Sequence, residues 1–231
     1  MHNQREKKIY IVIPAFNEEK VIGQVIKGIK NNGFTNIIIA DDGSSDDTKN
    51  AASNAGALCV RHDMNLGKGE ATVTAIEAAK ILDADVIVTM DGDGQHEPED
   101  IKLLIRPILE GKSDVVLSSR FLRKKSDIPR LKRLYNYLGN IVTWLSFGLW
   151  VTDSQSGFRA YSKKAANLIN TQGGDYEYES EVIREIHRHK LKYVEVPIKV
   201  YYTEHSMNKS KKQTLARGIQ TALKIIWKSI K

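Results

Sequence analysis

The sequence predicts an α/β protein with a mostly parallel central sheet flanked by helices. Short runs rich in β-branched residues alternate with amphipathic stretches along most of the chain. Polar, carboxylate-bearing turns follow several of these runs, which is typical of parallel strands that end at one edge of a sheet. No internal repeat or linker rich in Pro, Gly and Ser interrupts the pattern, and 231 residues suit one large domain.

Five strands are expected, at residues 9–13, 36–40, 57–61, 86–90 and 115–118. A further stretch, 193–202, alternates but contains Pro197, which has no N–H to donate, so we expect an edge strand there. Between the strands, residues 18–31 carry Val and Ile at helical spacing, residues 45–47 (SDD) cap a helix that precedes Ala51, and residues 101–108 repeat the apolar spacing.

The net charge of +7 is unevenly distributed along the chain. Residues 205–231 hold seven basic and no acidic residues, so the first 204 residues sum to zero. Within those, residues 120–133 contain seven more basic residues against Asp127 alone. A nucleic-acid-binding domain would need basic and aromatic contacts spread over a groove, whereas the excess of basic residues here is confined to these two segments. We therefore predict no nucleic-acid partner.

The cysteine content, the N-terminus and the most apolar stretch further restrict the class of protein. One cysteine, Cys59, excludes an internal disulfide and indicates a reducing compartment. Residues 1–8 lack the apolar region of a signal peptide, and we expect residues 1–7 to be disordered. The most apolar stretch, 134–151, is interrupted by polar residues and barely reaches spanning length, so we expect a core or interfacial helix.

The turn at 91–95 (DGDGQ) carries the clearest chemistry. Asp91, Asp93 and Gln95 follow a buried strand at two-residue spacing, which lets their oxygens converge on one hard divalent cation. A calcium loop of the helix-loop-helix type is excluded, because its twelfth position needs an acidic residue and holds Lys102 here. The alternative is that the two aspartates only cap a turn.

Two other turns are less specific. The segment 41–44 (DDGS) is also explained as a common Asp-Gly turn before a helix. The segment 65–69 (NLGKG) is not a phosphate-binding P-loop, because Gly69 follows Lys68 where Ser or Thr is required. It is not a dinucleotide fingerprint either, because Thr72 replaces the third glycine. A plain turn and a close backbone approach to a ligand both remain open.

Taken together, six segments in this order resemble glycosyltransferase family 2: 14–18 (PAFNE), 41–44 (DDGS), 65–69 (NLGKG), 91–96 (DGDGQH), 119–121 (SRF) and 153–160 (DSQSGFRA). The resemblance extends over residues 8–209 and is closest to the dolichyl-phosphate and polyprenyl-phosphate hexosyltransferases, typified by the dolichyl-phosphate mannose synthases. It implies a GT-A fold, which we place at residues 8–212, and an inverting transfer of a hexose from a nucleotide sugar.

The resemblance also implies roles for individual residues. The nucleotide sugar would be contacted by Pro14, Ala15, Phe16, Glu18, Asp41, Asp42, Lys68, Asp91, Gly92 and Asp93. Mg²⁺ or Mn²⁺ would be held by Asp91, Asp93 and Gln95. The acceptor phosphate would be bound by Arg120, Arg133 and Lys209, and the catalytic residues would be Asp93, Arg120 and Arg133. A bridging cation fits this chemistry, because it neutralises the charge that grows on a departing nucleoside diphosphate.

The acceptor decides the mechanism. The Gln-x-x-Arg-Trp segment that accompanies the general base in many relatives is absent here. An ionised phosphate monoester is already a nucleophile and needs only to be held in line, a task suited to arginine. We therefore expect a polyprenyl or dolichyl phosphate acceptor and GDP-mannose or a UDP-sugar as donor. The alternative is a soluble or glycan hydroxyl acceptor. Arg159 has two readings, a functional one and a structural one that ties down its loop.

The C-terminal segment 213–231 is expected to form a basic amphipathic helix. At 100° per residue, Arg217, Lys224, Lys228 and Lys231 share one face and the Leu and Ile residues gather opposite. Such a helix lies in a membrane interface. We therefore expect contact with the membrane through 213–231 and 134–151, from the cytoplasm at the inner face of the cell membrane. Packing of 213–231 on the sheet or on a second subunit, and hence an oligomer, is the alternative.

Overall fold

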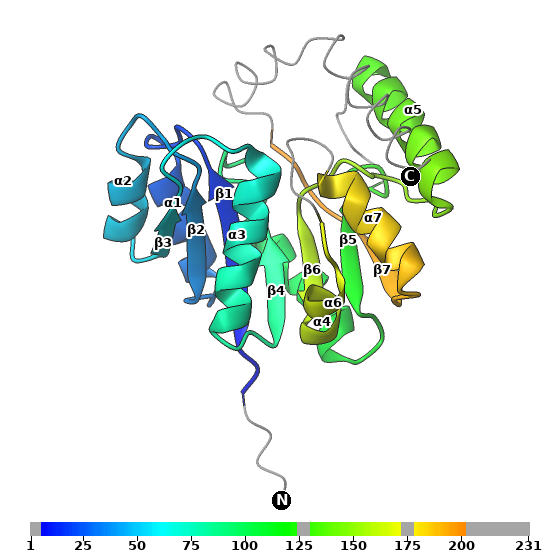
Figure 1. Cartoon of the computed structure of the whole chain (residues 1–231), viewed down its shortest axis with the longest axis horizontal. Coiled ribbons are helices and arrows are strands. Elements are labelled where there is room, and N and C mark those ends of the chain that lie inside the picture. The colour runs from blue at the N-terminus through cyan, green and yellow to red at the C-terminus, as the bar shows by residue number, and fades with distance from the viewer. Residues whose placement is uncertain (1–5, 124–129, 172–177, 202–231) are drawn as a thin grey trace, which may run out of the picture.

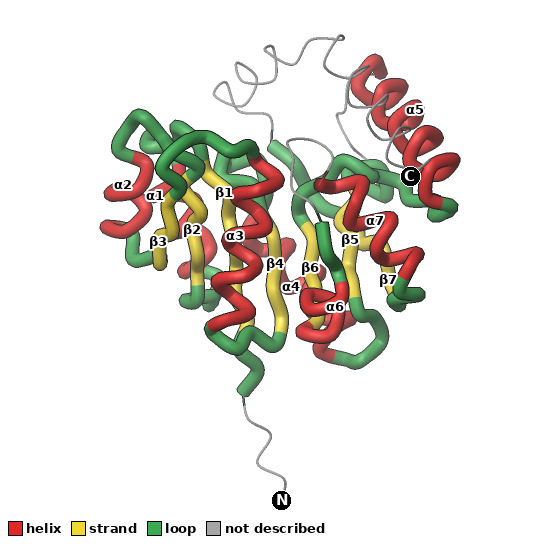
Figure 2. The backbone as a smooth tube through the Cα atoms, viewed as in Figure 1, coloured by secondary structure: helices red, strands yellow, loops and turns green. Residues whose placement is uncertain are grey.

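A computed structural model of the chain describes residues 6–123, 130–171 and 178–201. In these ranges a seven-stranded sheet has the order β3-β2-β1-β4-β6-β5-β7 and carries helices on both faces (Figures 1 and 2). Its strands are β1 (Ile9–Ala15), β2 (Ile37–Asp41), β3 (Leu58–Arg61), β4 (Val86–Thr89), β5 (Val115–Ser119), β6 (Arg159–Ser162) and β7 (Tyr193–Pro197).

The sheet is parallel except at β6, which runs antiparallel to both β4 and β5. The other six strands therefore end at one edge of the sheet, here called the carboxyl edge, and β6 begins there. The prediction of a mostly parallel sheet is confirmed. The sequence did not reveal β6, because its first two residues are the last two of the segment 153–160 and the strand has only four residues.

Two apolar clusters, one on each face, hold every α-helix of the described ranges except α5 on the sheet. The helices are α1 (Ile22–Asn31), α2 (Thr48–Asn54), α3 (Lys68–Ile81), α4 (Ile101–Leu109), α5 (Arg130–Phe147), α6 (Lys163–Leu168) and α7 (Tyr178–Arg188), with a 3₁₀ turn at Pro98–Asp100. Ile11 and Ile13 face the cluster that includes α1, α2 and α4, whereas Val12 faces α3, α6 and α7. This alternation follows from the two-residue period of a strand, and it makes the fold a three-layer sandwich.

Several element boundaries differ from the predictions. Helix α1 begins at Ile22 rather than at residue 18, because Asn17 has a positive φ of 54° and the backbone N–H of Glu18 donates to Thr48 Oγ1. Helix α5 covers Arg130–Phe147 rather than 134–151, and Gly148, with a φ of 74°, ends it. The edge strand is confirmed, but β7 stops at Pro197.

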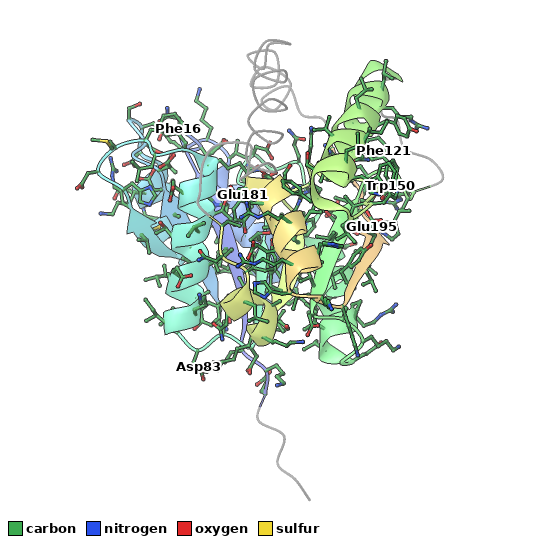
Figure 3. The ribbon with its side chains drawn as sticks, turned by 45° about the vertical axis from the view of Figure 1, so that its right-hand side comes forward. Phe16, Asp83, Phe121, Trp150, Glu181 and Glu195 are labelled. Carbon is green, nitrogen blue, oxygen red and sulfur yellow. The ribbon has the colours of Figure 1, made fainter. Side chains whose placement is uncertain are left out.

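Helix α5 lies apart from the two helical layers, beyond the carboxyl edge at the upper right of Figure 1. In the turned view of Figure 3, Phe16 and Phe121 lie toward this edge and Asp83 lies at the opposite one. No described helix is long and apolar enough to cross a membrane. Residues 1–5 and 202–231 fall outside the described residues, so Lys209 and the predicted helix 213–231 stay predictions.

Candidate active site

The turns that follow β1 and β2 are joined into one surface at the carboxyl edge. The backbone N–H of Asn17 donates to Ser44 Oγ at 3.0 Å, and Asn17 Oδ1 accepts from the backbone N–H of Ser45 at 2.9 Å. The N–H of Glu18 donates to Thr48 Oγ1 at 2.8 Å. These bonds fix the two segments in which nucleotide contacts are predicted.

The two aspartates at the end of β2 are buried and already engaged. Asp42 Oδ1 and Oδ2 accept from the backbone N–H groups of Leu66 and Gly67, each at 2.9 Å, and Oδ1 also lies 2.8 Å from His62 Nδ1. Asp41 Oδ1 accepts from the N–H of Ser44, and its Oδ2 pairs with an arginine of β3 at 3.2 Å. Asp42 therefore shapes the loop that precedes α3. That it also contacts a nucleoside stays a prediction.

Two neighbouring positions are exposed to different degrees. Phe16 is half exposed at the carboxyl edge, where an aromatic ring can lie against a base, whereas Ala15 is buried and its carbonyl accepts from the N–H of Asp42. Gly92 is closely packed: a Cβ at this position would lie 3.3 Å from the carbonyl oxygen of Pro14 and 3.2 Å from a methyl group of Ile13, so a side chain there would crowd the end of β1.

An ion cluster links three elements at the centre of the edge. Lys68, the first residue of α3, places its Nζ 2.8 Å from Asp91 Oδ1 and 2.9 Å from Glu179 Oε1 in the first turn of α7. Asp91 Oδ2 lies 3.3 Å from His96 Nε2. Burial alone would lower the pKa of Lys68, but the charges of Asp91 and Glu179 outweigh it and raise the pKa. Burial would raise the pKa of Asp91, but Lys68 and His96 together hold it well below its usual range.

Asp93 has the opposite electrostatic character from its neighbour. Burial raises the pKa of its carboxyl group, and the negative charges of Asp91 and Glu18 raise it further. Its Oδ1 accepts from the backbone N–H of Gln95 at 3.1 Å and its Oδ2 accepts from the Gln95 side-chain amide at 2.8 Å. Two carboxylates with unlike pKa values thus lie side by side, and Asp93 has no basic partner of its own among the hydrogen bonds and ion pairs of this turn.

The donor set fits a hard divalent cation. Asp91, Asp93 and the Gln95 amide offer oxygen ligands, and the positively charged Lys68 already stands against Asp91. A Cβ at Gly157 would come within 3.0 Å of both Asp91 Oδ1 and Lys68 Nζ, so a glycine there keeps the space open. No group of three His, Cys, Asp or Glu side chains in the described ranges is placed to hold a metal. A cation held here would depend on two carboxylates and an amide, and would keep positions for phosphate oxygens.

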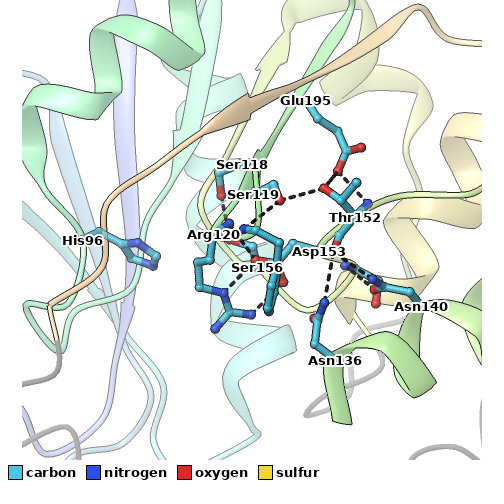
Figure 4. A network of polar contacts seen from close by, with 12 residues as sticks. His96, Ser118, Ser119, Arg120, Asn136, Asn140, Thr152, Asp153, Ser156 and Glu195 are labelled. Atoms are coloured by element: carbon cyan, nitrogen blue, oxygen red, sulfur yellow. Dashed lines mark hydrogen bonds and ion pairs between the residues drawn. The ribbon is translucent and has the colours of Figure 1, made fainter. Parts of the chain in front are cut away.

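The two predicted acceptor arginines occupy different environments. Arg120 makes a two-pronged contact with the buried Asp153: Nε and Nη2 each lie 2.7 Å from one carboxylate oxygen, and its backbone N–H also donates to Oδ2 (Figure 4). Its charge is balanced and its guanidinium plane is fixed. Arg133 is exposed in the first turn of α5. The binding of phosphate by either residue stays a prediction.

Arg159 is structural. It is only 2% exposed, and its three guanidinium nitrogens each donate at 2.8 Å to a backbone carbonyl, those of Ser154, Ser156 and Glu179. These bonds join the loop before β6 to the start of α7, and thereby position Glu179 beside Lys68. Of the two readings of Arg159, the structure supports the one in which it ties down its loop.

Helix α5 has the reverse polarity of an ordinary surface helix, with a polar inner face and an apolar outer face. Its polar residues Asn136, Asn140 and Thr143 are buried, whereas five of its large apolar residues are exposed and Phe147, at its end, is buried. Asn136 and Asn140 donate to the carbonyl of Thr152 at 3.0 and 2.8 Å, and Asn140 Oδ1 accepts from the N–H of Ser154 (Figure 4). The exposed set is Leu134, Tyr137, Leu138, Trp144 and Leu145, with Trp150 just beyond the helix; we call it the α5 apolar face.

Comparison with known proteins decides the family. A family model described as glycosyl transferase family 2 matches residues 10–169, which is more than half of the chain. The chain belongs to glycosyltransferase family 2. It is therefore a glycosyltransferase, and the resemblance drawn from its six ordered segments is confirmed.

Individual relatives support the assignment. The chain is 40% identical over 223 residues to a UDP-N-acetylglucosamine–dolichyl-phosphate N-acetylglucosaminyltransferase of Methanococcus voltae, covering 87% of this chain and 89% of the relative. It is 24% identical to a polyprenol monophosphomannose synthase of Mycolicibacterium smegmatis, covering 89% and 81%. A crystal structure of glucosyl-3-phosphoglycerate synthase from Mycobacterium tuberculosis with Mn²⁺ and UDP matches with a TM-score of 0.73 at 23% identity, covering 95% and 80%. The last likeness shows the GT-A fold.

Sequence reasoning missed two residues of this family-2 site. Glu179 lies far along the chain from Lys68 and Asp91, and its only signal is its place in an acidic start to an amphipathic stretch. His96 belonged to a quoted segment without a role; it contacts Asp91, and its ring lies 4.8 Å from that of Phe158 between centroids. Glu179 is brought to the site by tertiary packing, whereas His96 lies five residues after Asp91 in the same segment.

Proposed function

We propose that this family-2 enzyme transfers a sugar from a nucleoside diphosphate to a polyprenyl or dolichyl phosphate, with inversion at C1, at the cytoplasmic face of a membrane. The α5 apolar face carries the proposal, because a helix with polar residues inside and Leu, Tyr and Trp outside meets a lipid surface favourably. The helix begins at the basic segment that contains Arg133, so a phosphate-binding side chain and an apolar surface adjoin.

The chemistry requires little of the protein beyond positioning. An oxygen of the acceptor phosphate attacks C1 of the sugar, the bond from C1 to the diphosphate oxygen breaks, and its electron pair leaves with the nucleoside diphosphate. A divalent cation held by Asp91, Asp93 and Gln95 would neutralise the charge on that leaving group. No general base is needed, because the acceptor phosphate is already ionised. Arg133 would hold it, and Asp153 would keep Arg120 oriented toward it.

A UDP-sugar is the donor that we propose to test first. The relative from Methanococcus voltae is named for UDP-N-acetylglucosamine and dolichyl phosphate, and it is more similar to this chain than the mannose synthase cited above. The cation would be Mg²⁺ or Mn²⁺, since solved structures of glucosyl-3-phosphoglycerate synthase contain UDP with either ion.

The test is a transfer assay with radiolabelled UDP-N-acetylglucosamine or GDP-mannose and dolichyl phosphate, with Mn²⁺ present. We expect a labelled lipid product, and we expect Arg133→Ala to raise the KM for the lipid phosphate while leaving UDP binding unchanged. Arg106→Ala, which removes an exposed arginine from α4, is the matched control. Transfer only to soluble hydroxyl acceptors would refute the lipid-phosphate assignment and favour the alternative acceptor class.

A further inference from the structure

A lysine bridges two carboxylates at the centre of the donor site. Lys68 Nζ contacts Asp91 Oδ1 at 2.8 Å and Glu179 Oε1 at 2.9 Å, and the Glu179 side chain is almost fully buried. Two carboxylates this close repel each other unless a cation lies between them. Lys68 therefore supplies the positive charge that these two carboxylates need.

The contact with Asp91 conflicts with binding of a divalent cation. Lys68 occupies Oδ1 of Asp91, and Oδ2 faces His96. A doubly charged ion at Asp91 and an ammonium group on the same carboxylate oxygen repel each other strongly at such distances. The two cations therefore compete for this carboxylate, whereas the contact between Lys68 and Glu179 involves no predicted metal ligand.

We propose that Lys68 neutralises Asp91 until a divalent ion displaces its ammonium group from that carboxylate, and that Glu179 is the positioning residue that retains the displaced ammonium. This inference rests on the proposed function, because it takes Asp91 to be a metal ligand. Lys68 begins the 14-residue helix α3, whose N-terminus faces the carboxyl edge and favours anions. Because Glu179 holds it, the displaced Lys68 ammonium group stays beside the donor diphosphate. Binding of the ion and binding of the nucleotide are therefore coupled.

The experiment measures Mn²⁺ affinity by calorimetric titration and by electron paramagnetic resonance of free Mn²⁺, without nucleotide and then with UDP. The full chain is compared with Lys68→Met, Glu179→Gln and the double variant. Lys68→Met removes the competing cation and should tighten Mn²⁺ binding about tenfold. Glu179→Gln leaves Lys68 with Asp91 as its remaining carboxylate and should weaken Mn²⁺ binding about fivefold. In the double variant the effect of Glu179→Gln should disappear, because Glu179 acts through Lys68.

A matched control comes from the far end of the same helix. Lys80→Met removes one positive charge from α3 about 18 Å along its axis, beyond the screening length at physiological salt, and should leave Mn²⁺ affinity unchanged. With UDP present, the factor by which the nucleotide tightens Mn²⁺ binding should fall in Lys68→Met.

The outcomes separate this inference from the function on which it rests. Equal Mn²⁺ affinity in the parent, Lys68→Met and Glu179→Gln overturns the exchange but leaves the metal site intact. A weakening by Glu179→Gln that persists without Lys68 assigns Glu179 a direct effect on the ion and overturns its positioning role. Absence of Mn²⁺ binding in every protein overturns both the exchange and the metal site. If Lys68→Met fails to fold, Glu179→Gln still decides, since unchanged affinity contradicts the proposal.

Discussion

Substitution of Leu145 by Gln tests whether the α5 apolar face meets a membrane. Leu145 is 72% exposed, so most of its side chain is available for transfer into lipid. Burying a whole leucine side chain is worth roughly 1.5–3 kcal/mol, which makes the available part worth about 1–2 kcal/mol. We therefore expect Leu145→Gln to lower the vesicle partition coefficient about 5- to 30-fold.

The matched control is Ile81→Gln. Ile81 is even more exposed, at 84%, but it is the last residue of α3 and so lies at the sheet edge opposite to α5. The substitution removes an apolar side chain of the same size and should leave partitioning unchanged. The double variant Leu138→Gln/Leu145→Gln should lose the sum of the two single effects in free energy, provided that both side chains enter the lipid independently.

The assay is co-sedimentation of the full chain with vesicles of mixed phosphatidylcholine and phosphatidylglycerol, with the thermal midpoint and the solution mass measured in parallel. Vesicle binding of Leu145→Gln equal to that of Ile81→Gln would refute the membrane assignment. A lowered thermal midpoint or a changed solution mass without vesicles would refute it as well, because the face would then be covered by protein.

Two further predictions concern the interior of the site. Arg159→Met should lower the free energy of unfolding by about 3 kcal/mol or more, measured by urea denaturation, because three carbonyls lose a buried charged donor; an unchanged urea midpoint would contradict the structural role. Asp93→Asn should raise the thermal midpoint of the protein in EDTA at neutral pH. The folded-state pKa of Asp93 is raised, so the ionised form destabilises the fold, and the gain should shrink as the pH falls and the parent carboxyl protonates. A gain that is independent of pH would assign the effect to packing.

Local patterns in the sequence were sufficient to predict the parallel part of the fold. The β-branched runs and the amphipathic stretches reproduce β1 to β5 and most of their helices, because strand and helix periods are encoded residue by residue. Strand β6 was not predicted, because a four-residue antiparallel strand that lies between two others shows no alternation of polar and apolar residues. The start of α1 was misplaced because hydrogen bonds to the next turn hold Glu18 outside the helix.

The candidate site could also be predicted in part from local patterns in the sequence. Turns that follow parallel strands meet at one edge, which places Asp91 there, and the resemblance to family 2 assigns Lys68 to the same site; the two side chains are in contact. The residues that set the charge state of Lys68 and Asp91 could not be assigned from the sequence. Glu179 reaches Lys68 from α7, whose start is fastened by Arg159 to the loop before β6, and Arg120 is balanced by Asp153 across 33 residues. Such pairings depend on tertiary distance, which spacing in the sequence does not report.

The reversed polarity of α5 follows from the loop that it holds. Residues 152–154 offer a carbonyl and an N–H that need partners, and Asn136 and Asn140 satisfy them from the inner face of the helix. The same loop carries Asp153, which fixes Arg120, and Thr152 donates to Glu195 on β7. Because Asn136 and Asn140 commit the inner face to these polar bonds, the residues of the α5 apolar face point outward. The loop that fixes Arg120 at the carboxyl edge is therefore also the loop whose polar bonds turn the Leu and Trp side chains of α5 outward, and a phosphate on a lipid chain requires both features.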